Sequence, residues 1–288
     1  MRTISPLRYP GGKACLLDLT ASILRLNNLQ CGHYAEPFAG GCGLALSLLY
    51  GGHVAEIHIN DLDKGIWSFW HAVLFETEAL VELVQNTAVT IDEWHLQRAR
   101  YVDQVGSPLE LGFATFFLNR TNRSGIIKGG GVIGGLDQRG NYKIDCRFNV
   151  DDLVRRIRRV ARYRDRIHLT NLDALDFIEA CRSFPDRSLI FLDPPYYRKG
   201  PGLYTSFYKP ADHEMLAARV KSIETPWVVT YDDVPQIREL YRGQDRFSFD
   251  IHYSLNEKRT GTELLVASAG LRVPSEAQER LINEAAAV

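Results

Sequence analysis

Apolar and polar positions alternate in a regular way over the first 63 residues. A loop and then a helix are predicted at 13–27, and a short strand follows at 33–37. A glycine-rich turn at 38–43 leads into LALSLLYGG, which predicts a helix that ends near 51–52. VAEIHIN then predicts a second strand, ending at 60–61. Strand, turn, helix and strand in this order are typical of the beginning of a doubly wound α/β sheet.

A similar pattern returns in the last part of the chain. IHLTN (167–171) predicts a strand, and SLIFLD (188–193) is a continuous apolar run of the kind found in buried parallel strands. PWVVTYDD (226–233) predicts another strand, and FSFDIHYSL (247–255) with TELLVAS (262–268) predicts a closing pair. The fold class that follows is α/β, with one sheet assembled from two separated parts of the chain.

A segment of different character separates these two parts. Residues 64–119 carry apolar side chains at spacings of three and four, which predicts helices. A glycine-rich, irregular stretch at 120–149 precedes a basic helix at 150–163. We therefore predict a sheet domain made of residues 1–63 and 165–272, an inserted and mainly helical domain at 64–164, and a C-terminal tail at 273–288.

Composition narrows the class of protein. Of the 288 residues, 45% are hydrophobic and 24% are charged, as in a soluble globular protein. No apolar run approaches the roughly 20 residues of a membrane helix, and the first residues lack the apolar core of a signal peptide. We expect a cytoplasmic protein with no membrane partner. The five cysteines are scattered and form no CxxC pair, so neither a disulfide framework nor a metal site is expected.

Charge is distributed unevenly along the chain. The formal net charge is −1, yet residues 120–166 hold 13 Lys and Arg against 5 Asp and Glu. A local basic excess of this size can form a phosphate-binding face. The alternative is a solvated helix surface, because five of the arginines lie at 155–162.

The clearest candidate for chemistry is the motif Asp193-Pro194-Pro195-Tyr196, at the end of the predicted strand SLIFLD. Ligands of open α/β sheets bind at the carboxyl ends of the strands. Two prolines stiffen the loop, so a carboxylate and carbonyls can face the crevice while the tyrosine ring stacks on a planar substrate. Acceptors that hold the N–H groups of an aryl amine can aim its lone pair at a methyl donor. A rigid turn with a packed tyrosine is the alternative.

Three further motifs are candidates for binding a nucleotide-like ligand. EPFAGGCG (36–43) is glycine-rich but fits neither the GxGxxG nor the GxxxxGK[ST] pattern, and Asp61 about 20 residues later can accept hydrogen bonds from ribose hydroxyls. Asp61 can equally cap a helix. The motif YPGGK (9–13) can hold a carboxylate through backbone amides and the lysine, or it can form only a tight turn. Asp173 can accept a hydrogen bond from an adenine amino group, or it can cap a helix.

In this order, these motifs resemble the alpha group of DNA adenine-N6 methyltransferases, the Dam-like family. The resemblance extends from Arg8 to about Ser268 and is carried by RYPGGK, EPFAGGCG, INDLD, FFLNRTNRSG, DCRFN, NLDALDF, DPPYY, YTSFYKPADHEML and TELLVAS. It implies a Rossmann-like, S-adenosylmethionine-dependent methyltransferase sheet whose inserted domain recognises the target. It also implies an enzyme that methylates the N6 amine of an adenine flipped out of double-stranded DNA, without a metal.

The resemblance assigns roles residue by residue. The catalytic residues would be Asp193, Pro194, Pro195 and Tyr196, with Tyr196 stacked on the flipped base. The cofactor would be bound by Tyr9, Gly12, Lys13, Glu36, Phe38, Gly40, Gly43, Asp61, Asp173 and Asp193, with Pro10 and Gly11 in the same N-terminal motif. Phe207 and His213 match a segment that helps to form the cofactor and base pockets.

The expected DNA contacts lie in the inserted domain. They are Asn119, Arg120, Asn122, Arg123, Lys128 and Arg139. Arg120 and Arg123 can each pair with guanine or instead contact phosphate, and Asn122 can pair with adenine. Residues 121–124 differ from the aromatic and Asn-Gly features of members that methylate GATC, so the target sequence stays open.

Three other functions compete with this interpretation. The same chemistry serves the exocyclic amine of cytosine, although serine often replaces Asp193 there, and it also serves RNA or a protein glutamine amide. A DNA-binding module without catalysis is the non-enzymatic alternative. A monomer of bacterial, archaeal or phage origin is expected, and a cognate restriction nuclease is a partner that the resemblance allows.

Overall fold

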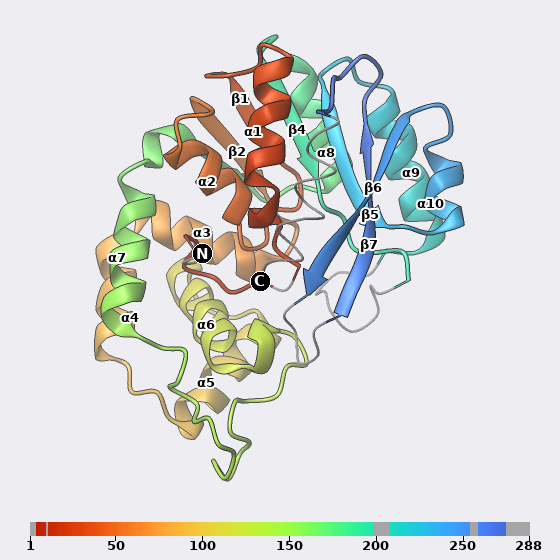
Figure 1. Ribbon diagram of the computed structural model, residues 1–288. Coiled ribbons are helices and arrows are strands. Elements are labelled where there is room, and N and C mark those ends of the chain that lie inside the picture. The colour runs from red at the N-terminus through yellow and green to blue at the C-terminus, as the bar shows by residue number, and fades with distance from the viewer. Residues whose placement is uncertain (1–3, 10, 199–207, 254–258, 275–288) are drawn as a thin grey trace.

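The computed structural model describes residues 4–9, 11–198, 208–253 and 259–274, and Figure 1 gives their arrangement. A seven-stranded sheet forms the centre, with strand order β3-β2-β1-β4-β5-β7-β6. The strands are β1 (His33–Glu36), β2 (Glu56–Asn60), β3 (Ile167–Thr170), β4 (Ser188–Leu192), β5 (Trp227–Asp232), β6 (Asp245–Tyr253) and β7 (Arg259–Ala267).

The directions of the strands confirm the predicted Rossmann-like sheet. Strands β1 to β5 pair in parallel, and β7 is antiparallel to both β5 and β6. All five residues of β4 are buried, as its continuous apolar sequence predicts for a strand covered on both faces. The chain order reverses between β1 and β4, and a crevice for ligands forms at such a point, beyond the carboxyl ends of the strands.

Helices cover both faces of the sheet because successive residues of each strand point to opposite sides. Tyr34 of β1 and Phe191 of β4 pack on the side of α1 and α2, whereas Ala35 and Ile190 pack against α8, α9 and α10. The bounds of these helices are α1 (Leu17–Leu26), α2 (Gly43–Tyr50), α8 (Ala174–Ala180), α9 (Pro210–Lys221) and α10 (Pro235–Leu240).

Five helices lie between β2 and β3 in the chain: α3 (Lys64–Phe75), α4 (Thr77–Asn86), α5 (Ile91–Asp103), α6 (Pro108–Thr121) and α7 (Val150–Ala161). Helix α6 begins with a capping box between Ser107 and Glu110, followed by Pro108. A Cβ atom on Gly112 would lie 2.5 Å from the Ser68 carbonyl oxygen, so glycine lets α6 approach α3 closely. Residues 122–149 between α6 and α7 are mostly irregular.

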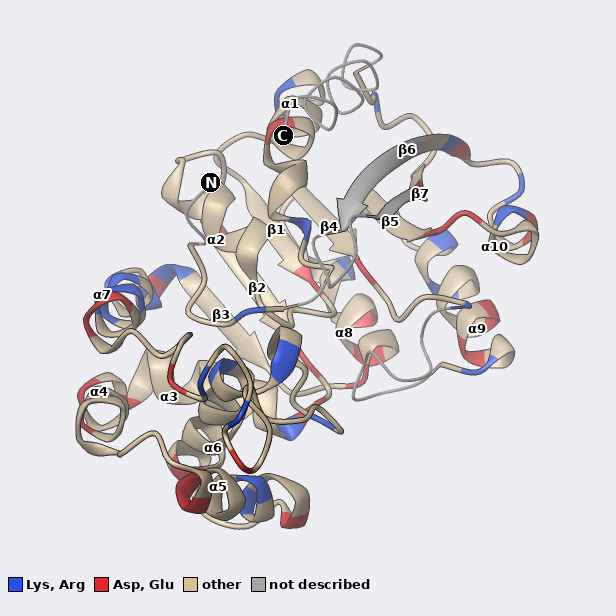
Figure 2. Ribbon diagram, turned by 60° about the horizontal axis from the view of Figure 1, so that its bottom comes forward, with Lys and Arg blue, Asp and Glu red and all other residues tan. Residues whose placement is uncertain are grey.

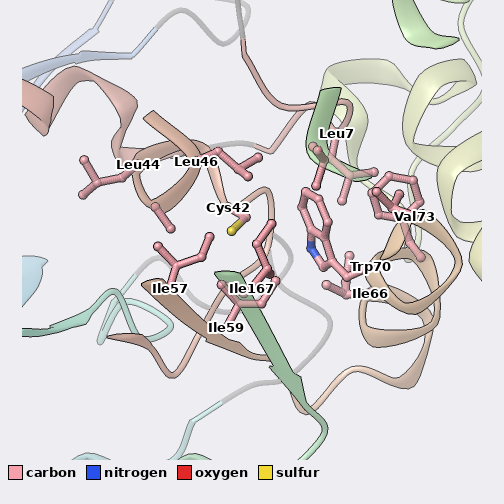
Figure 3. Close-up of a cluster of buried hydrophobic side chains, with 14 of the residues drawn as sticks. Leu7, Cys42, Leu44, Leu46, Ile57, Ile59, Ile66, Trp70, Val73 and Ile167 are labelled. Atoms are coloured by element: carbon pink, nitrogen blue, oxygen red, sulfur yellow. The ribbon is translucent and has the colours of Figure 1, made fainter. Parts of the chain in front are cut away.

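The helices between β2 and β3 share a continuous core with the sheet. Figure 3 shows Trp70 and Val73 of α3 beside Cys42, Ile59 and Ile167. The indole Nε1 of Trp70 also donates to the Gly40 carbonyl at 3.0 Å. Helix α3 therefore supports the glycine-rich turn directly, and the inserted helices position the site that this turn forms.

Two further expectations concern membrane-spanning helices and the C-terminal tail. Among the described residues, no helix combines the length and the apolar character that a membrane span requires. The predicted tail at 273–288 lies outside the described residues from 275 onward.

Candidate active site

The motifs that follow β1, β2 and β4 meet at the carboxyl edge of the sheet. The backbone N–H of Gly40, after β1, donates to Asp61 Oδ2, after β2, at 2.9 Å. Asp193 follows β4, which pairs with β1 at the switch point. Lys13, from the N-terminal motif, lies 3.0 Å from Asp193 Oδ1. Four motifs far apart in the sequence therefore form one site.

The glycine-rich turn is shaped by its contact with Tyr9. Gly40 has a φ of +44°, and a Cβ atom there would lie 2.8 Å from the Tyr9 ring. A Cβ atom on Gly41 would lie 2.6 Å from Tyr9 Cβ. Glycine is required at this turn, because any side chain would push Tyr9 away. Gly43 begins α2, and Gly12 packs against the Tyr9 carbonyl.

Asp61 is held from two sides at the end of β2. Its Oδ2 accepts from Gly40, and its Oδ1 accepts from the N–H of Asp63 at 3.0 Å. The helix cap proposed for Asp61 is made by Asp63 instead, whose Oδ1 accepts from Ile66 at the start of α3. Burial raises the pKa of Asp61 to about 7, and the two N–H donors oppose this shift.

Glu36 lies beneath the turn and is directed into the protein. Its Oε1 accepts from the Tyr34 hydroxyl at 3.0 Å and from the N–H of Ala45, in the first turn of α2, at 3.1 Å. Burial raises the pKa of Glu36 to about 8. These contacts give Glu36 a supporting position under α2, and a direct contact with a cofactor stays a prediction.

The centre of the site is a buried cluster of four side chains: Lys13, Asp193, Tyr196 and Glu263. The Lys13 ammonium lies 3.0 Å from Asp193 Oδ1 and 3.6 Å from Glu263 Oε2, and it donates to the Tyr196 hydroxyl at 3.0 Å. The Tyr196 hydroxyl donates in turn to Glu263 Oε1. One ammonium thus faces two carboxyl groups. The sum of these three charges is negative when both carboxyl groups are ionised.

The protonation of Asp193 depends on opposing influences. Burial raises the pKa of this carboxyl, the Lys13 ammonium lowers it, and Glu263 raises it. Thr230 of β5 donates to Asp193 Oδ1 at 2.9 Å. Oxygen Oδ1 is therefore bound by Lys13 and Thr230, and 24% of the Asp193 side chain is exposed to solvent. A second cation at the site would favour the ionised carboxylate.

The predicted stacking face of Tyr196 is not open in this structure. Tyr196 is 3% exposed, and Lys13 lies 5.2 Å from the centre of its ring. The structure shows Tyr196 packed in the interior, which is the alternative that the sequence allowed. Its hydroxyl is bound by Lys13 and Glu263. Stacking on a base would require this loop to rearrange.

Asp173, Phe38 and His213 lie around a second part of the site. Asp173 is exposed and caps α8, accepting from the N–H of Leu175 at 2.8 Å. The ring centres of Phe38 and Tyr208 are 5.9 Å apart, and those of Tyr208 and His213 are 5.4 Å apart. Pro10 and Phe207, which the resemblance also places here, lie outside the described residues.

Three polar residues of the site were not identified from the sequence: Thr230, Asp232 and Glu263. Asp232 accepts from the backbone N–H groups of Tyr197 at 2.8 Å and Arg198 at 3.0 Å, and so fixes the loop that follows Pro195. Glu263 is 1% exposed. The available signal was a carboxylate within the apolar strand TELLVAS, because such a residue is rarely buried unless it is paired.

The structure contradicts the expected base contacts of Asn119, Arg120 and Asn122, because all three side chains are buried. Asn119 bonds to both the N–H and the carbonyl of Arg8, and the Arg120 guanidinium donates to the Pro6 carbonyl. Burial, with Arg156 and Arg8 nearby, lowers the pKa of Arg120 to about 9.

The Asn122 side chain also makes hydrogen bonds inside the protein. Its Oδ1 accepts from the Trp94 indole at 2.7 Å, and its Nδ2 donates to the Ile126 carbonyl at 2.8 Å. By contrast, Arg123, Lys128 and Arg139 are exposed on the segment between α6 and α7. Figure 2 shows basic segments around α6 and along α7.

Comparisons with known proteins point to a methyltransferase. The model of the family described as D12 class N6 adenine-specific DNA methyltransferase matches residues 9–260. No curated protein matches the chain in sequence.

Solved structures show only distant similarity. A Pyrococcus horikoshii protein proposed to be an RNA methyltransferase is 11% identical with a TM-score of 0.43, covering 91% of this chain and 84% of its own. The rRNA methyltransferase aviRa from Streptomyces viridochromogenes is 13% identical with a TM-score of 0.35, covering 86% and 83%. Precorrin-6y C5,15-methyltransferase from Geobacter metallireducens GS-15 is 12% identical with a TM-score of 0.33, covering 88% and 86%.

Replacing Asn122 by alanine is expected to destabilise the protein by about 1–3 kcal/mol, because the Trp94 indole and the Ile126 carbonyl would lose their buried partner. The matched control is Arg123→Ala, whose exposed side chain predicts a change within about 0.5 kcal/mol. Urea unfolding of both variants measures the difference. Equal midpoints for Asn122→Ala and the unmodified protein would contradict the structural role of Asn122.

Proposed function

The chain belongs to the family of D12 class N6 adenine-specific DNA methyltransferases, and we propose that it methylates the N6 amine of an adenine flipped out of duplex DNA. S-adenosylmethionine is the proposed methyl donor. The observation that carries the proposal is the half-buried carboxylate of Asp193 at the switch point of the sheet, held by Lys13 and Thr230. Chemistry on a base inside a duplex requires the base to leave the stack.

The chain's own part in the reaction is to hold and orient the amine. Asp193 Oδ1 is bound by Lys13 and Thr230, so the carboxylate is fixed as an acceptor for an amine N–H group. Holding the N–H groups would aim the nitrogen lone pair at the methyl carbon, so that the N–C bond would form as the S–CH3 bond breaks, with S-adenosylhomocysteine as the leaving product. The nitrogen would then lose one proton to solvent water. The bound sulfonium cofactor supplies an already activated methyl group, so positioning is the main contribution of the protein.

Several residues at the carboxyl edge of the sheet suit the nucleoside part of S-adenosylmethionine. Gly40 and Gly41 let the Tyr9 ring pack directly on the glycine-rich turn, which places the N-terminal motif beside it. Asp61 ends β2, where a carboxylate can accept from the ribose hydroxyls. Phe38 and Asp173 would contact the adenine of the cofactor.

The helices inserted between β2 and β3 are the proposed target-recognition domain, residues 64–164. Arg123, Lys128 and Arg139 are exposed on its irregular segment, which suits contact with DNA bases or phosphates. Asn119 links the start of that segment to Arg8, next to Tyr9 of the cofactor motif. DNA bound on this segment would therefore lie next to the proposed methyl-donor site.

The direct test is methyl transfer to unmethylated duplex DNA with labelled S-adenosylmethionine, followed by digestion and mass spectrometry of the nucleosides. N6-methyl-2′-deoxyadenosine is the expected product. Asp193→Asn is expected to lower the rate by about 100-fold or more while cofactor affinity changes little, because it removes an anionic acceptor. The matched control is Asp233→Asn, which alters a carboxylate beside the same sheet edge that is paired with Arg238.

The outcomes separate the competing functions. N4-methylcytosine would keep the mechanism and overturn the choice of base. If DNA stays unmethylated while the cofactor binds, RNA or a protein amide becomes the acceptor. If neither transfer nor cofactor binding occurs, the interpretation as a binding module returns. Near-normal activity of Asp193→Asn would refute the assigned acceptor.

The pKa of Asp61 predicts how the affinity of the protein for a nucleoside depends on pH. Its pKa of about 7 means that the carboxylate ionises as pH rises from 6 to 8, and the ionised form accepts better from ribose hydroxyls. Affinity should therefore rise with pH, by up to about tenfold over this range. Calorimetry with 5′-methylthioadenosine isolates the effect, because this probe has the ribose but no group that titrates near neutral pH.

Asp61→Asn is the control for this dependence, because an amide at this position does not titrate. Its affinity for 5′-methylthioadenosine should be weaker and nearly constant with pH. A pH-independent affinity in the unmodified protein, or an equal pH dependence in Asp61→Asn, would show that Asp61 does not bind the ribose.

A further inference from the structure

A group of imidazoles and one carboxylate lies on three neighbouring strands, away from the proposed active site. His33 is the first residue of β1, Glu56 is the first of β2, His58 follows two residues later, and His168 lies near the start of β3. Figure 2 shows these strands side by side. Asp61 and Asp193 follow the opposite, carboxyl ends of their strands, so this group is a separate feature of the sheet.

The register of the strands brings the side chains to the same face. His33 is directly opposite Glu56, and His58 is directly opposite His168. Glu56 and His58 are two residues apart in β2, so their side chains point to the same side. His33 Nδ1 lies 2.9 Å from His58 Nε2, and one ligand atom from each of His33, Glu56 and His58 lies within 4.8 Å of the others.

We propose that His33, Glu56 and His58 bind one divalent transition-metal ion, with zinc as the ion that this donor set fits. Imidazole nitrogens and carboxylate oxygens bind zinc at about 2.0–2.2 Å, which places tetrahedral ligand atoms about 3.3 Å apart. The 2.9 Å between His33 Nδ1 and His58 Nε2 is close to this separation, and the ligand atoms of all three residues lie within 4.8 Å of one another. Two histidines with one glutamate leave the fourth position for water, as in known three-ligand zinc sites.

The surroundings of the three ligands support this assignment. His168 Nε2 bonds to Glu56 Oε2 at 2.6 Å, which lowers the pKa of Glu56 and orients its carboxylate. Metal-binding carboxylates commonly have such a hydrogen-bonded partner. The Phe184 ring covers one side, 4.3 Å from the His58 ring centre.

A metal ion at this position would join β1 to β2, and His168 would extend the link to β3. The ligands come from residues 33, 56 and 58, so the site has no compact sequence motif, and only the register of parallel strands brings it together. The contribution is to the stability of the sheet, because an ion that binds the folded chain but not the unfolded chain stabilises the fold.

The test uses untagged protein treated with a chelator and then titrated with Co²⁺, which takes the place of zinc and absorbs visible light when four-coordinate. We expect one Co²⁺ per chain, displacement by Zn²⁺, and a higher midpoint of thermal unfolding with Zn²⁺. His58→Gln and Glu56→Gln should each weaken binding by about 100-fold or more, and His168→Gln by about 10–100-fold.

His71→Gln is the matched control. His71 lies 3.5 Å from Glu76 on α3, an imidazole and carboxylate pair outside the proposed ligand set, so its loss should leave cobalt binding unchanged. Urea unfolding in chelator establishes that each variant folds, and Glu56→Gln is the safer variant because it keeps the shape of the side chain. The proposal would be overturned if the unmodified protein does not bind Co²⁺. It would also be overturned if folded Glu56→Gln and His58→Gln bind Co²⁺ as tightly as the unmodified protein does.

Discussion

The Lys13 ammonium joins parts of the chain that are far apart in sequence. It contacts Asp193 after β4, Tyr196 in the following loop and Glu263 in β7, and it also donates to the Gly11 carbonyl at 3.0 Å. Removing one partner of a buried or half-buried ion pair is strongly destabilising, so the Lys13 ammonium stabilises both carboxylates. The N-terminal segment must therefore lie across the sheet edge for the site to exist.

The rest of the fold holds that segment in place. Asn119 on α6 binds both backbone groups of Arg8, and the Tyr9 ring fills the space left by Gly40 and Gly41. Trp70 on α3 supports the turn from the other side. The helices between β2 and β3 are therefore part of the scaffold of the site as well as the proposed DNA reader.

The sequence predicted the sheet well because apolar strands and glycine turns are local signals. The apolar part of SLIFLD forms the fully buried β4, and TELLVAS lies in β7, which pairs with β6 as the predicted closing pair. The structure adds that this pair is antiparallel. Local signals did not show where polar side chains point. Asn119, Arg120 and Asn122 lie in a basic, polar segment, yet tertiary packing buries them. For the same reason, the pairing of Glu263 and the grouping of His33 with His58 could not be read from spacing, since each depends on strand register.

The claim that the buried cluster positions the acceptor can be tested most directly with Glu263→Gln. The measurement is the single-turnover rate of methyl transfer, with cofactor affinity and unfolding midpoint determined on the same protein. If Glu263 fixes Tyr196 and Lys13, the transfer rate falls by about 100-fold while cofactor affinity stays within about twofold, as expected for a misplaced acceptor. An unchanged transfer rate in a folded Glu263→Gln protein would contradict the account.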